Sequence, residues 1–144
     1  MAQAGTGTTI GIETAESTYT DIGEVLDISL DGQQNSTIDT TDLSSTGKTF
    51  IGGLPDYGSV TLNYKRAASD AGQTAVKSAF ASADITGFKI TFPKTTGQTS
   101  GDTMTFDALV TGWSLDGLST DKVITYKVTL KISGAITETA GATE

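Results

Sequence analysis

The sequence predicts a mainly β protein: an antiparallel β-sandwich or partly rolled barrel of about seven strands, with one inserted α-helix. Threonine is abundant throughout the 144 residues and, with valine and isoleucine, supplies the β-branched side chains that suit a half-buried sheet. Several segments alternate apolar and polar residues, as strands with one solvated face do. One segment changes to helical spacing. The length favours a single domain over residues 1–144.

The first strands are predicted near the N-terminus. Residues 1–9 are small and polar and are expected to form a flexible arm. A short strand follows around Ile10 and Ile12. The segment EVLDISLDG then alternates apolar with polar residues: Leu26, Ile28 and Leu30 against Asp27, Ser29 and Asp31. Its last two residues, Asp-Gly, are typical of a turn, so residues 36–41 are predicted to return as the second strand of a hairpin.

A long polar and glycine-rich loop is predicted from Asp42 to Tyr57. A small domain seldom carries so long an irregular connection without a use for it. Its apolar residues are Phe50, Ile51 and Leu54, beside Pro55. They either fold back on the core or form a contact surface for another subunit.

The second half of the chain contains the helix and the clearest strands. The helix is predicted within residues 69–82, where Asp70 and Gln73 have the spacing of a capping box. Strand alternation marks residues 60–64, 88–92, 104–110 and 124–132, and Gly112 before Trp113 is typical of a bulge. Beyond Gly134 the polar tail, residues 134–144, is predicted to be a second flexible arm.

The composition argues against most kinds of catalytic, metal-binding and nucleic-acid-binding site. Cysteine and histidine are both absent, which removes disulfides, thiolate nucleophiles, and the commonest general base and metal ligand at neutral pH. The net charge of −8 opposes nucleic-acid binding. No apolar run approaches the roughly 20 residues that span a bilayer, and the N-terminus lacks the features of a signal peptide. We therefore expect a soluble protein made in a cytoplasm.

Two local patterns suggest chemistry that the rest of the sequence does not support. SSTGKT, residues 44–49, ends like a phosphate-binding loop, but Asp42 stands where that loop needs glycine and no helix follows. Four carboxylates, Asp27, Asp31, Asp39 and Asp42, cluster around the first hairpin, where carboxylates can cleave glycosides or hold calcium. The alternation instead favours a solvated sheet face for Asp27 and Asp31. No catalytic, cofactor or metal site is predicted.

The order of these features resembles one family, the major tail tube proteins of long-tailed bacteriophages. The resemblance runs from about Ile10 to Ile132. It rests on the hairpin GEVLDISLDGQQNSTIDTTDLSS, the return through GGLPDYGSVTLNY, the single short helix, and the ending TFDALVTGWSLDGLSTDKVITYKVTLKISG.

The resemblance implies a structural virion protein and not an enzyme. Members of the family form hexameric rings around a shared inner β-barrel, and the rings stack into a tube through which DNA passes. The loop from Asp42 to Tyr57, with Phe50, Ile51, Leu54 and Pro55, would then reach the neighbouring ring. Expected partners are other copies of the chain, the tail-tip or baseplate initiator, the tape measure protein and the terminator. The expected location is the virion tail, assembled in the host cytoplasm.

An acidic conduit would also repel the DNA that passes through it. The candidates to face such a lumen are Asp27, Asp31, Asp39 and Asp107. Lys89 lies on the polar face of its strand and would act against repulsion if it also faced the lumen. Other functions remain open at this point: an Ig-like adhesin or decoration domain, another ring protein of the tail such as a terminator or baseplate-proximal tube, the tube of a secretion machine, or a carboxylate glycosidase.

Overall fold

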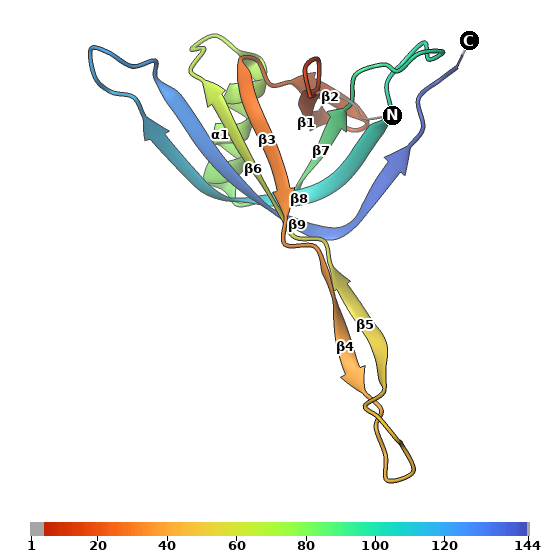
Figure 1. Cartoon of the computed structure of the whole chain (residues 1–144). Helices are drawn as coiled ribbons and strands as arrows, with labels where there is room; N and C mark the ends of the chain where they lie inside the picture. Colours follow the sequence, from red (N-terminus) through yellow and green to blue (C-terminus); the bar gives the residue numbers. More distant parts are fainter. Residues whose placement is uncertain (1–4, 144) are drawn as a thin grey trace.

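Nine strands and one helix make up residues 5–143, the part of the chain that the computed structural model describes (Figure 1). The predicted fold class is confirmed: the chain is mainly β, its strands pair antiparallel, and one helix is inserted. The elements are β1 (Thr9–Ala15), β2 (Thr18–Asp21), β3 (Val25–Asp31), β4 (Gln34–Asp39), β5 (Phe50–Asp56), β6 (Ser59–Lys65), α1 (Ala71–Ser82), β7 (Thr86–Thr91), β8 (Thr103–Asp116) and β9 (Thr125–Thr139).

Seven strands form one rolled sheet in the order β2-β1-β7-β8-β9-β6-β3, and β4 and β5 form a separate two-stranded hairpin. Strands β8 and β9 are long enough to run through both halves of the rolled sheet. One part of β8 pairs with β7, and the part of β9 from Thr125 to Lys131 pairs with β6. Register shifts interrupt the β8–β9 ladder between Thr105 and Asp107 and between Val110 and Gly112, which confirms the predicted bulge at Gly112. Figure 1 shows both strands bending across the base of the sheet.

The core lies on the inner face of this rolled sheet. Apolar residues from both halves of the sheet meet in one cluster: Ile10, Ile12, Val60, Leu62, Tyr64, Phe88, Ile90, Phe106, Ala108, Val110, Val128, Leu130 and Ile132, with Val76 and Ala79 from α1. Cross-strand partners share a face, so the alternation in the sequence places these residues together. Phe88 and Phe106 stack with ring centroids 5.9 Å apart.

Helix α1 is attached to the sheet through its first turn. Asp70 is the N-cap and accepts a hydrogen bond from the backbone N–H of Gln73 at 2.9 Å, which confirms half of the predicted capping box. The Gln73 side chain does not reach back to the cap. It is buried, and it accepts from the Ala67 N–H and donates to the carbonyls of Gly23 and Lys65, each at 2.9 Å.

The predicted pairing of the first hairpin is wrong. Strand β3 pairs with β6 and not with the residues that follow it. Those residues form β4, which pairs with β5, so Phe50–Asp56 is a strand and not part of an irregular loop. Only residues 40–49 connect the two strands. The turn at Gly32 therefore leads out of the sheet, and Gly58 leads back into it.

Two further expectations need correction. Leu26 was expected on the core face with Ile28 and Leu30, but it is 55% exposed because a register shift between Val25 and Asp27 turns Val25 toward the core instead. At the C-terminus, Gly134–Thr139 continues strand β9 and pairs with β8 rather than forming a free arm. At the N-terminus, Thr9 belongs to β1, and residues 1–4 of the expected arm lie outside the described residues.

Candidate assembly surfaces

Hairpin β4–β5 projects from the sheet as a separate finger (Figure 1). Threonines hold its tip together: the Thr40 N–H donates to the Thr49 carbonyl at 2.9 Å, and the Thr49 N–H donates to the Thr41 hydroxyl at 2.8 Å. At the end of the tip, one Asp42 carboxylate oxygen accepts from the N–H and hydroxyl of Ser44 and from the Ser45 hydroxyl. Hairpin β4–β5 is therefore hydrogen-bonded along its strands and across its tip.

The apolar side chains of this hairpin are exposed. Ile38 and Ile51 are cross-strand partners and are 51% and 54% exposed. Phe50, Leu43 and Leu54 are exposed as well, and none of the five belongs to the core cluster. A two-stranded hairpin with no third strand or helix on it is only marginally stable in water. Such an element gains most by packing against another molecule.

The predicted loop residues thus all lie on this one projecting element. Phe50, Ile51, Leu54 and Pro55 belong to β5, and Asp42 lies at the tip. The contact residues predicted from the sequence did not include Ile38 and Leu43. Ile38 stands alone among polar residues and Leu43 lies within the polar segment, so the sequence alone does not mark them.

The base of the hairpin is fixed to the sheet by Asp56. Its carboxylate accepts from the Gly58 N–H at 2.9 Å and from the Lys131 ammonium group of β9 at 3.0 Å. These hydrogen bonds lower the pKa of Asp56, the one from Gly58 most. The orientation of hairpin β4–β5 relative to the sheet is therefore set partly by the ion pair between Asp56 and Lys131.

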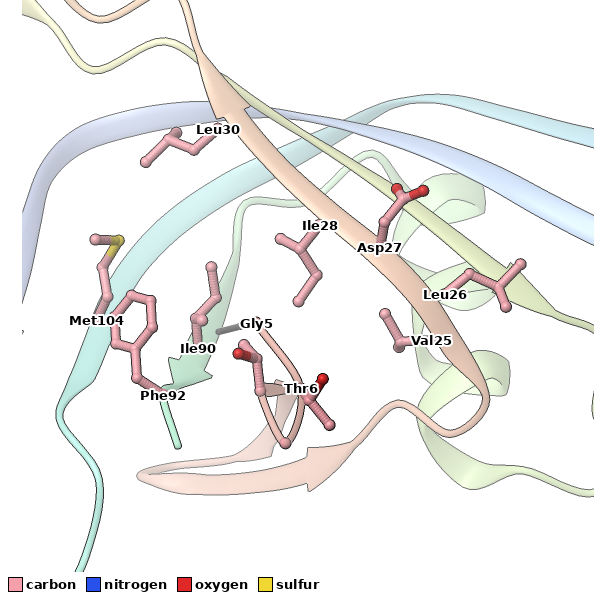
Figure 2. A pocket seen from close by; sticks show the side chains of 12 residues that line it. Gly5, Thr6, Val25, Leu26, Asp27, Ile28, Leu30, Ile90, Phe92 and Met104 are labelled. Atoms are coloured by element: carbon pink, nitrogen blue, oxygen red, sulfur yellow. The ribbon is translucent and has the colours of Figure 1, made fainter. Parts of the chain in front are cut away.

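An apolar groove of about 840 Å³ opens between edge strand β3 and the other half of the sheet. Figure 2 shows Val25, Ile28 and Leu30 on one side of the groove, with the other side formed by Ile90, Phe92 and Met104. The segment from Gly5 to Thr8 lies at its margin. The groove is the place where the rolled sheet stays open, because β3 and β2 are the two edges and do not pair with each other.

Three of the four predicted lumen carboxylates share the outer, polar face of the sheet. Asp31 and Lys131 both pair with Ser59, while Asp27 and Lys127 both pair with Asn63. Asp107 joins the same face through its pairing with Ser133 of β9. Asp39 does not, because it ends β4 on the projecting hairpin.

That outer face carries both signs of charge. Lys127 and Lys131 lie among the carboxylates, and Lys89 of β7 is on the same side, where its ammonium nitrogen lies 5.6 Å from the Tyr19 ring centroid. The carboxylate of Asp27 accepts from the Asn63 amide at 2.7 Å. Lys127 and Lys131 therefore offset the negative charge of this face as Lys89 does, although the sequence-based prediction named only Lys89.

The carboxylates of the hairpin tip are held in their charged form. Hydrogen bonds from Thr41 lower the pKa of Asp39, and hydrogen bonds from Ser44 and then Ser45 lower the pKa of Asp42. Both carboxylates are therefore ionised at neutral pH. Within residues 5–143 no three acidic side chains gather as metal ligands would, and no helix there is long and apolar enough to cross a membrane.

Comparison with known proteins identifies solved structures that share this fold. No family model matches the sequence, and no curated protein matches it. Solved structures do match. A chain from the tail of an empty gene transfer agent particle, refined with C6 symmetry, has a TM-score of 0.76 at 19% identity, covering 96% of this chain and 100% of that one.

Two further solved structures share the fold. The SPP1 tail tube matches with a TM-score of 0.70 at 13% identity, over 94% of this chain and 77% of that one. The cap that terminates the tube of the anti-feeding prophage matches with a TM-score of 0.69 at 11% identity, over 93% and 88% of the two chains. These likenesses, together with the rolled sheet and its projecting hairpin, show that the chain has the fold of tail tube proteins.

Proposed function

We propose that this chain is the structural subunit of a virion tail tube, in which copies form rings of six and the rings stack into a conduit for DNA. The observation that carries the proposal is hairpin β4–β5, whose exposed apolar side chains project from a tail tube fold. The role needs no catalysis and no cofactor. The chain assembles in the host cytoplasm and its place is the tail.

Ring formation follows from the open sheet. Strands β2 and β3 are its two edges, and unpaired edges invite pairing with another chain. When identical copies join edge to edge and the rotation closes, they form a ring with a continuous inner barrel and no free edge. The C6 symmetry of the gene transfer agent tail supports six as the number of copies.

Stacking is the role we assign to the hairpin. A ring that joins its copies side by side needs a second, axial contact to grow into a tube. Hairpin β4–β5 extends beyond the sheet, and Phe50, Ile51 and Leu54 give it an apolar surface to bury on the next ring. Asp42 and Pro55 belong to the same contact.

The outer polar face of the sheet is the proposed lining of the passage. Asp27, Asp31 and Asp107 there repel phosphates, while Lys89, Lys127 and Lys131 limit that repulsion. A lining of mixed sign lets DNA pass without specific binding. Other partners are the tail-tip or baseplate initiator, the tape measure protein and the terminator.

A terminator is the second candidate, because the tube-terminating cap of the anti-feeding prophage shares this fold. The two roles differ in growth. A tube subunit adds ring upon ring, whereas a terminator forms one ring and stops.

Electron microscopy of the purified protein over a range of concentrations, with light-scattering mass alongside, tests the proposal. We expect rings and hollow tubes whose length grows with concentration. Single rings that never stack would indicate the terminator. A strict monomer at every concentration, with or without added tail-tip complexes, would overturn both.

A matched pair of variants tests the hairpin itself. The double substitution Phe50→Ser with Ile51→Thr removes apolar surface from β5 and is expected to leave rings that do not stack. Leu118→Ser, at an apolar residue 70% exposed in the β8–β9 connection, is the control and should leave tubes unchanged. Equal tube lengths for both variants would contradict the stacking role.

A further inference from the structure

A pocket of about 210 Å³ lies at the start of helix α1, between that helix and strands β6, β8 and β9. It is lined by side chains of two kinds, aromatic and basic: Tyr64, Trp113 and Tyr126, with Arg66 and Lys77. The aromatic rings are packed together, with centroids 5.5 Å apart for Tyr64 and Tyr126 and 4.8 Å apart for Trp113 and Tyr126. The pocket is separate from edge strands β2 and β3 and from hairpin β4–β5, the elements to which the ring and stacking contacts are assigned above.

The Tyr64 hydroxyl in this pocket is buried and has no hydrogen-bond partner among residues 5–143. Burial raises the pKa of Tyr64 to about 12, so the hydroxyl keeps its proton. The Trp113 indole approaches and partly offsets this rise, but it does not reach hydrogen-bond geometry. A buried hydroxyl without a partner is rare, and this one adds a polar group close beneath the wall of the pocket.

The two cations of the pocket are also without a carboxylate partner in the described part of the chain. Arg66 donates through Nε to the Tyr126 hydroxyl at 3.1 Å, and its other guanidinium nitrogens make no ion pair there. The Lys77 ammonium nitrogen lies 5.6 Å from the Trp113 ring centroid. Asp70 lies nearby, but one of its carboxylate oxygens already accepts from the Gly23 and Gln73 N–H groups. In a chain of net charge −8, two such cations at one pocket mark a site for an anion.

The aromatic walls restrict what kind of anion fits. Trp113 and Tyr126 are partly buried and offer apolar faces beside the charged groups. A carboxylate next to an aliphatic side chain matches this combination: the carboxylate meets Arg66 and Lys77, and the aliphatic group packs on the rings. The volume equals that of about seven water molecules, enough for an acidic side chain and its neighbour.

We propose that this pocket binds the hairpin tip of another copy, with the Asp42 carboxylate between the cations and Leu43 against the aromatic rings. Asp42 is ionised and exposed, and Leu43 beside it is fully exposed. The inference rests on the proposed stacking of rings and names the surface that receives the hairpin.

The positions of the two sites support this occupant. Strand β6 begins beside the hairpin at Ser59 and ends at Lys65, next to the pocket. Figure 1 shows the β6–α1 connection at the end of the sheet opposite the hairpin. In a head-to-tail stack along this direction, the hairpin tip of one copy points toward the pocket end of the next.

Charge reversal provides the first experiment. Asp42→Lys and Arg66→Glu should each shorten or abolish tubes in electron microscopy, and the double variant should restore them because the two charges again attract. The combination of Asp42→Lys with Lys122→Glu, an exposed lysine in the β8–β9 connection, is the control and should not restore tubes. Tubes that form normally with Arg66→Glu, or a double variant that is no better than Asp42→Lys, would overturn the inference. Wild-type chains that form no tubes would instead count against the proposed function.

A second experiment does not depend on tubes. Trp113 is the single tryptophan, so its fluorescence reports on the pocket directly. The full-length Asp42→Lys chain, whose own tip cannot compete, is titrated with a cyclised peptide of residues 37–51. We expect a saturable change, and binding at least tenfold weaker for a peptide with Asp42→Asn or for a receiving chain with Arg66→Gln. Equal binding of both peptides, an equal effect of acetate at the same concentration, or no change would overturn the inference.

Discussion

At the scale of single residues, Gln73 shows how one polar side chain organises its surroundings. Its side chain makes three hydrogen bonds to backbone groups that lie outside helix α1, namely Gly23, Lys65 and Ala67. Gly23 lies in the turn before β3, Lys65 ends β6, and Ala67 lies in the connection between β6 and α1. Gln73 is buried and the three hydrogen bonds are partly buried, so losing them is costly. The residue thereby joins the helix to one end of the sheet, beside the aromatic and basic pocket.

The substitution Gln73→Ala is expected to lower the free energy of unfolding by about 3 kcal/mol, because it leaves three partly buried backbone groups without these partners. Chemical denaturation followed by circular dichroism measures the loss. Gln33→Ala, at an exposed glutamine, is the control and should change stability by less than about 0.5 kcal/mol. Equal unfolding midpoints for the two variants would show that Gln73 has no such role.

At the scale of elements, the junction between the hairpin and the sheet depends on backbone shape. The chain leaves β3 through Gly32 at φ +80° and enters β6 through Gly58 at φ +83°. The two glycines lie against each other: a Cβ at Gly58 would collide with the Asp31 carbonyl oxygen. Such a close approach with positive φ is available only to glycine. The finger therefore leaves the sheet at a fixed place.

Gly58→Ala should accordingly destabilise the protein by about 3 kcal/mol or more, since it combines a left-handed backbone with a collision against backbone atoms. Two other glycines separate these effects. Gly134 also has a positive φ, +87°, but a Cβ there would meet no neighbouring atom, so Gly134→Ala should cost about 1–2 kcal/mol. The third variant is Gly52→Ala, because Gly52 in β5 has neither a positive φ nor a neighbour that a Cβ would touch. Thermal unfolding of the three variants gives the comparison. A Gly58→Ala protein as stable as Gly134→Ala would show that the junction tolerates a side chain.

At the scale of the whole molecule, the ionisable groups set the pH range in which the fold is stable. Hydrogen bonds lower the pKa of Asp39, Asp42, Asp56 and Asp102; the Gly141 N–H is the main donor to Asp102. A lowered folded-state pKa contributes stability that is present above the unfolded value, about 3.9, and is lost as pH falls through the folded value. Histidine is absent, so no side chain of that type changes charge between about pH 5 and 8.

We therefore expect the thermal unfolding midpoint to stay nearly constant from pH 7 to about 5.5 and to fall below about pH 4. Differential scanning calorimetry at pH 7, 5.5, 4 and 3 measures this. The variant Asp102→Asn, which cannot ionise at that position, should lose less stability between pH 4 and 3 than the parent chain. A large drop between pH 7 and 5.5 would contradict the assignment.

The sequence by itself determined the mainly β class, the helix with its Asp70 cap, the bulge at Gly112 and the core faces of β6 to β9. These features depend on local periodicity and on hydrogen bonds between near neighbours in the chain. The tertiary structure alone decided that β3 pairs with β6 and that β4 and β5 leave the sheet together. Strand pairing is a non-local choice, and Gln34–Asp39 and Phe50–Asp56 bury no complete face whose alternation would reveal it. The pocket around Tyr64 was hidden for the same reason, because Arg66, Lys77 and Trp113 come from separate elements that only the folded sheet brings together.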